Sequence, residues 1–231
     1  SPGPGVALAE QAGINSTATH TSVNNMFYGC TSFNQNVSFS GLNLVSVTND
    51  MFSGAALFNN GDTTNAGAQP MDLSTKTSAL QNASNMFSGC VAFNQTVTFS
   101  DVSRVASLAY MFDGATLFNN GATSDVGGRQ LSFATTTSAL TNANSMFNNC
   151  AAFNQTVTFG STAGVTTFYQ MFANASIFNN GDVGDLGGVA AAVGLGTQLV
   201  QELAHSVDDL DVGFLVPAAD VIDLARLAGG E

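Results

Sequence analysis

The stretch MFSGCVAFNQTVTFS at residues 86–100 decides how this chain folds, because it is written three times. It stands 60 residues earlier as MFYGCTSFNQNVSFS (26–40) and 60 residues later as MFNNCAAFNQTVTFG (146–160). Further Met-Phe pairs lie between these copies, so that the spacing alternates between 25 and 35 residues. Such self-similarity indicates an array of stacked coils rather than a globular domain. The six pairs begin at Met26, Met51, Met86, Met111, Met146 and Met171.

Each coil is predicted to contain a short helix and a short strand. Apolar or small residues recur at positions i, i+3, i+6, i+7 and i+10 of residues 80–90, which favours one helical face, and Gly89 is a helix stop. In residues 93–99, Phe93, Val97 and Phe99 alternate with polar residues, as expected of a strand. About six coils of this α/β repeat would together bury one apolar seam.

The chain divides into three parts. Residues 20–188 carry the paired coils of 25 and 35 residues, and residues 1–19, which open with SPGPG, are expected to form a linker or N-terminal cap. His20 occupies the position of Leu80 in an incomplete first coil and is interpreted as a capping residue. Residues 189–231 lose the repeat and are amphipathic, which predicts a helical C-terminal cap for the array.

An asparagine follows the second phenylalanine of every coil. A side-chain amide at this position can satisfy backbone groups that a tight coil turn leaves unpaired. We therefore expect a structural ladder of amides, and not a binding site, at Asn34, Asn59, Asn94, Asn119, Asn154 and Asn179.

The pattern Met-Phe-x-Gly-Cys/Ala-x-x-Phe-Asn-Gln, with Asp101-Val102-Ser103 and a following Val-x-x-Leu, resembles the BspA-like leucine-rich-repeat surface proteins over roughly residues 20 to 180. The chain has no Trp, and Phe39, Phe99 and Phe159 stand where that family usually has one. The resemblance implies a right-handed leucine-rich-repeat-like solenoid. It also implies a non-catalytic extracellular or surface-displayed protein that mediates adhesion or recognises a protein or glycan.

The three cysteines occupy one repeat position, which is alanine in the alternate coils. A position that accepts Cys or Ala is small and apolar, and free Cys behaves as a small hydrophobe. Successive cysteines lie two coils apart, or about 10 Å, which is too far for a disulfide. We therefore expect three buried free thiols at Cys30, Cys90 and Cys150.

The long coils carry glycine-rich inserts that begin at Asn59, Asn119 and Asn179. Inserts of stacked repeats project from one face, so they form either a recognition ridge with a weak calcium site or a row of plain surface loops. The acidic candidates for calcium are Asp62, Asp125, Asp182 and Asp185. Among the Asn-x-Ser/Thr triplets, Asn15 is the most plausible glycosylation site.

The net charge of −12, with 4 Lys and Arg residues, argues against nucleic acid as a partner. No apolar run is long enough for membrane insertion. We expect no cofactor and no enzymatic activity, because nucleophile, P-loop and zinc-protease motifs are missing. Two function classes remain: a surface recognition protein that binds a protein or glycan, or a structural subunit of a virion, fibre or other extracellular assembly that binds copies of itself.

Overall fold

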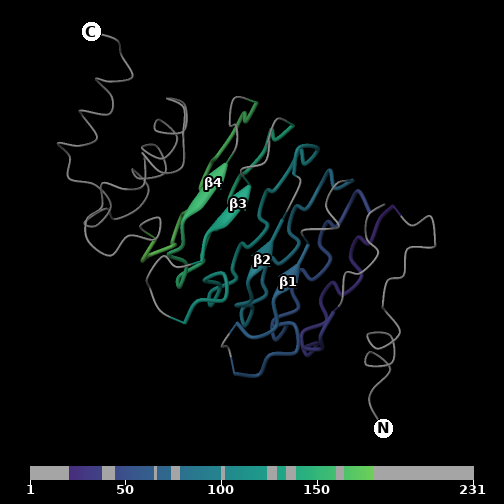
Figure 1. Cartoon of the computed structure of the whole chain (residues 1–231), viewed down its shortest axis with the longest axis vertical. Coiled ribbons are helices and arrows are strands. Elements are labelled where there is room, and N and C mark those ends of the chain that lie inside the picture. Colours follow the sequence, from purple (N-terminus) through teal and green to yellow (C-terminus); the bar gives the residue numbers. More distant parts are fainter. Residues whose placement is uncertain are drawn as a thin grey trace, which may run out of the picture.

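The structure, a computed structural model, describes residues 21–37, 45–64, 67–73, 79–99, 102–123, 129–133, 139–159 and 164–178. Four short strands are present: β1 (Met71–Asp72), β2 (Val97–Thr98), β3 (Leu131–Phe133) and β4 (Val157–Phe159). β1 pairs in parallel with β2, and β3 pairs in parallel with β4. Figure 1 shows the four strands side by side in chain order. The expected linker at 1–19, His20 and the expected cap at 189–231 lie outside the described residues.

A second parallel ladder connects the coils at one residue each. Its bridges run without interruption from Ser22 to Val47 and onward, and every bridge is parallel. The bridging residues are 25 and 35 residues apart in alternation, which is also the spacing of the Met-Phe pairs. Each coil therefore lies beside the next coil of the chain, with equivalent residues in register. The ladder consists of Ser22, Val47, Asn82, Ser107, Asn142 and Thr167.

The Met-Phe pair forms the next rung of every coil. The backbone N–H of Phe27 donates to the carbonyl of Met51, one coil later, at 2.8 Å. The same bond recurs at all five junctions with N···O distances of 2.8–3.0 Å, so the donors always point toward the following coil. The other four bonds join Phe52 to Met86, Phe87 to Met111, Phe112 to Met146, and Phe147 to Met171.

The helix expected in each coil is not formed in the described residues, where hydrogen-bonded turns stand in its place. The residue directly before each Met has a left-handed backbone, with φ between 51° and 57°. An α-helix requires φ near −63°, so one left-handed residue interrupts it. The apolar spacing that resembled a helical face is therefore produced by tight turns. The left-handed residues are Asn25, Asp50, Asn85, Tyr110, Ser145 and Gln170.

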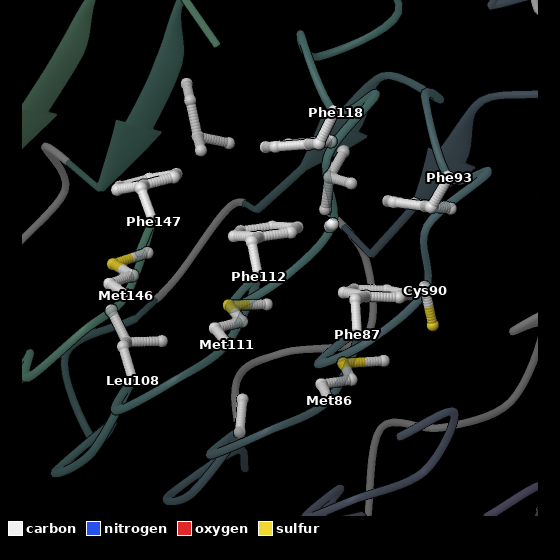
Figure 2. Packing of buried hydrophobic residues seen from close by; sticks show 14 of the residues in the cluster. Met86, Phe87, Cys90, Phe93, Leu108, Met111, Phe112, Phe118, Met146 and Phe147 are labelled. Carbon is white, nitrogen blue, oxygen red and sulfur yellow. The ribbon is translucent and has the colours of Figure 1, made fainter. Parts of the chain in front are cut away.

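Phenylalanine rings fill the core in columns that run along the stack (Figure 2). In one column, Phe87, Phe112 and Phe147 stack with ring centroids 5.5 and 5.6 Å apart. In the neighbouring column, Phe93 and Phe118 are 5.7 Å apart. Both columns continue through all six coils, and rings of this spacing gain energy beyond their buried area. The repeat thus buries a continuous aromatic core that a single coil could not bury.

Candidate functional site

The conserved-position asparagines connect successive coils through their side-chain amides. Asn94 Oδ1 accepts hydrogen bonds from the backbone N–H groups of Asn119 (2.8 Å) and Gly121 (2.9 Å), and Asn94 Nδ2 donates to the carbonyl of Ala122 (2.9 Å). Asn34 makes the equivalent three bonds to the coil that contains Asn59. Asn59 and Asn119 each accept the backbone N–H of the next asparagine. Asn179 lies outside the described residues.

A second asparagine, which the sequence analysis did not single out, closes the start of each insert. Asn120 Oδ1 accepts the backbone N–H of Val97 (2.8 Å), and its Nδ2 donates to the carbonyl of Arg129 (3.1 Å). Asn60 does the same with Val37 and Gln69. A side chain here replaces a strand partner, which is why β2 and β3 are not hydrogen-bonded to each other. The repeated Asn-Asn-Gly at 59–61 and 119–121 was the available signal.

The buried glutamines Gln95 and Gln155 were also missed. Gln95 Nε2 donates to Asn59 Oδ1 (2.8 Å), and its Oε1 accepts the backbone N–H of Gln69 (2.8 Å). Gln155 repeats these bonds with Asn119 and Arg129. Each glutamine therefore joins the end of one insert to the amide ladder. The signal was the invariable Gln of the three Phe-Asn-Gln copies.

Asp62 is turned into the stack, where it closes its own insert loop. Only 7 % of Asp62 is exposed. Asp62 Oδ1 accepts the hydroxyl and the backbone N–H of Thr64, both at 2.7 Å, and Oδ2 accepts Gln95 Nε2 (3.1 Å) and the backbone N–H of Ala68 (3.2 Å). These bonds, led by those from Thr64, hold the pKa of the carboxyl well below its ordinary value despite its burial. The carboxylate is thus already saturated by protein donors.

The remaining acidic candidates for calcium, Asp125, Asp182 and Asp185, lie outside the described residues, as does Asn15. Within the described ranges, no three His, Cys, Asp or Glu side chains gather where they could hold one metal ion. Asp62 is surrounded instead by N–H and O–H donors, which repel a cation. The described part of the first insert therefore contains a hydrogen-bonded loop closure and not a cation site.

The three thiols are free, but they are not alike, and the expectation that all three are buried was wrong for Cys30, which is exposed. Cys90 Sγ donates to the carbonyl of Phe52, and Cys150 Sγ donates to that of Phe112, each at 3.0 Å. Both carbonyls belong to the preceding coil. No described coil precedes that of Cys30, so nothing equivalent covers it. Burial raises the pKa of the Cys90 and Cys150 thiols far above the ordinary value, with the charge of Asp113 adding to the effect at Cys150.

The short strands present a polar surface to solvent. Met71, Val97, Leu131 and Val157 point into the core, and the alternate residues point outward, as the pleat of a strand requires. Outward-facing neighbours bond to each other: Thr98 Oγ1 donates to Asp72 Oδ1 (3.0 Å), and Thr158 Oγ1 donates to Ser132 Oγ (3.3 Å). We call this surface the polar strand face; it consists of Asp72, Thr96, Thr98, Arg129, Gln130, Ser132 and Thr158.

Arg129 and Gln130 extend the polar strand face at the end of the second insert. Arg129 Nη1 donates to Thr96 Oγ1 (2.8 Å), and Gln130 Nε2 donates to Thr158 Oγ1 (3.0 Å). Gly121 lies directly beneath: with φ +77°, a Cβ atom there would come within 2.6 Å of Thr96 Oγ1. The backbone thus holds a fixed group of hydroxyl, amide, carboxylate and guanidinium groups at the surface. Such a group can form several simultaneous hydrogen bonds with a polar ligand.

The comparisons with known proteins bear on identity alone. No helix among the described residues is long and apolar enough to cross a membrane. A comparison with curated proteins found no match, and neither did a comparison with solved structures. One family model, described as "Mycoplasma protein of unknown function, DUF285", matches residues 11–72 and 62–181. Together these matches span well over half of the chain and include all the coils described above. The chain therefore belongs to the DUF285 family of repeat proteins, which supports its likeness to BspA-like repeats at the level of the repeat family.

Proposed function

We propose that this chain is a non-catalytic, surface-displayed or extracellular repeat protein that recognises a protein or glycan on another surface. The observation that carries the proposal is the polar strand face, in which Thr98, Arg129 and Thr158 are held in register by the coils beneath them. Glycans are dense in hydroxyl groups, and a row of side-chain hydroxyls and amides offers matching donors and acceptors. Of the two ligand classes, this surface favours a glycan.

The proposal includes the architecture expected for the whole chain, a right-handed leucine-rich-repeat-like solenoid closed by a helical cap. Parallel bridges between successive coils and continuous Phe columns support that architecture in the described residues. A rigid scaffold suits recognition, because its binding groups lose little conformational freedom when a ligand binds. DUF285 membership supports the broader statement that this is a repeat protein of surface type.

Binding to a printed array of neutral and acidic oligosaccharides tests the proposal. Replacing Thr98 and Thr158 by arginine places two long charged side chains on the polar strand face, and we expect binding to fall roughly tenfold or more. The matched control replaces Thr141 and Thr166, two exposed threonines beside the bridge ladder, in the same way. Equal loss in both variants, or no binding by the wild-type chain, would contradict glycan recognition by this face.

A second candidate is a structural subunit of a virion, fibre or other extracellular assembly. One observation favours it: the first described coil exposes apolar side chains, including Met26, that every later coil covers. A subunit that binds copies of itself would place such a surface against a neighbour. The two candidates differ in where they place the contact surface, since the polar strand face lies along the stack and Met26 lies at its beginning.

A further inference from the structure

The first described coil, residues 21–37, has an open side that the later coils do not have. Met26 is 43 % exposed, whereas its equivalents in the other five coils are 0–1 % exposed. Tyr28 is 61 % exposed, and Cys30 is exposed although Cys90 and Cys150 are fully buried. In the later coils the same positions are covered by the coil before them. The exposed side chains therefore mark a surface built to contact a coil.

The backbone of this surface has free acceptors at the same place. At each of the five junctions, three carbonyls of one coil accept N–H groups from the preceding coil, at N···O distances of 2.7–3.0 Å. The equivalent carbonyls of the first described coil belong to Asn24, Met26 and Tyr28, and they accept no hydrogen bond from any described residue. We call these three residues together with Cys30 the leading face.

The last described coil, residues 164–178, offers the complementary donors. In the coil before it, the N–H groups of Ser145, Phe147 and Asn149 donate to carbonyls of the next coil. The equivalent N–H groups belong to Gln170, Phe172 and Asn174, and they donate to no described residue. Because both rows are copies of one repeat, the three donors have the spacing that the three acceptors require. None of these residues or those of the leading face carries a charge, so the net charge of −12 is not concentrated at this contact.

We propose that the leading face binds the last described coil of a second copy of this chain, so that copies join head to tail. The contact would repeat the five internal junctions: three N–H···O=C bonds, with Met26 and Cys30 covered as their equivalents are. Addition of one backbone edge to another is an established mode of recognition. A contact between two different surfaces of one molecule forms a ring if its rotation closes and an open filament if it does not. This inference goes beyond the proposed recognition function and does not depend on it.

Light scattering after size exclusion, over a hundredfold range of concentration, measures the association. We expect the wild-type mass to rise with concentration, and the variant M26E to remain a monomer because a carboxylate would be buried without a partner. The matched control is L117E, because Leu117 is also 43 % exposed but lies within the stack. L117E should associate like the wild type. A wild-type chain that stays monomeric, with the leading face covered by its own chain or by another protein, overturns the proposal, as does association that M26E leaves intact.

A cross-linking experiment tests which surfaces meet. The variant N174C places a thiol on the exposed end of the last described coil, close to where Cys30 of a second copy would lie. Mild oxidation should give disulfide-linked oligomers on a non-reducing gel, and the double variant N174C/C30S should give none. Oligomers that persist in the double variant would show another contact and overturn the head-to-tail arrangement. Circular dichroism that is unchanged from the wild type confirms that each variant has folded.

Discussion

The Oδ1 atom of Asn94 lies 2.8 Å from the backbone nitrogen of Asn119, which follows it by one coil. A second N–H, that of Gly121, shares this oxygen at 2.9 Å, and the side-chain nitrogen donates to the carbonyl of Ala122. One amide thus satisfies three backbone groups of the neighbouring coil. Asn94 is buried, so water cannot take its place if the side chain is removed.

Replacing Asn94 by alanine should therefore lower the free energy of unfolding by about 2–4 kcal/mol, since each lost bond leaves a buried donor or acceptor unsatisfied. Urea denaturation followed by circular dichroism measures the change. Asn36 is the control, because it is exposed and its amide bonds are longer, at 3.3 and 3.4 Å. N36A should cost less than about 0.5 kcal/mol. Equal losses in the two variants would contradict a specific role for the amide ladder.

Asp62 predicts a loss of stability in acid. Hydrogen bonds from Thr64 hold the pKa of this carboxyl below its ordinary value in the folded chain. The unfolded chain therefore takes up the proton first, at a pH near 4, so the contribution of Asp62 is complete above that pH and is lost as the pH falls toward the lower folded pKa. In D62N, which has no carboxyl at this position, that component of the pH dependence should disappear.

Chemical denaturation of the wild type and D62N between pH 6 and pH 3 checks this expectation. At pH 6, D62N should be the less stable protein, because its amide nitrogen faces N–H donors. The difference between the two proteins should shrink as the pH falls. A difference that stays constant over this range would show that Asp62 is not the group that titrates.

The thiols should differ in reactivity. In native protein at pH 8, a thiol reagent such as Ellman's should modify Cys30 rapidly, because it is exposed. Cys90 and Cys150 should react only after unfolding, because burial both blocks the reagent and raises the thiol pKa. The variant C30S should lose the native reaction, and C90A should keep it. Reaction of more than one thiol in native protein would contradict this assignment.

Ser145 is the least suitable residue at the left-handed position before Met. Its φ is 51°, and its buried hydroxyl has no hydrogen-bond partner. Replacing it by glycine removes both the backbone strain and the unsatisfied hydroxyl, while glycine adds some entropy to the unfolded chain. We expect a net stabilisation of about 1 kcal/mol by thermal or urea unfolding. The control N85G should gain less, because asparagine tolerates this conformation; destabilisation by S145G would refute the argument.

The repeat spacing alone indicated which residues lie side by side, because Met51 and Met86 can be in register only if the coils between them stack. The type of turn could not be predicted from apolar spacing, since tight turns around Asn85 and a helix give the same i, i+3, i+7 pattern. The deciding signal was a polar residue before each Met. Asp62 was misread as a surface acid because its partner Gln95 comes from the next coil, and no local rule relates the two.

Each long coil depends on a short coil on both of its sides. Asn60 holds the preceding coil through Val37, and Gln69 is held by Gln95 of the following coil. Duplication of 25 residues alone would place two short coils together and leave one of these clamps empty. Gene duplication or recombination can therefore lengthen the array without damage only in steps of 60 residues, and relatives of different length should differ by whole multiples of that unit.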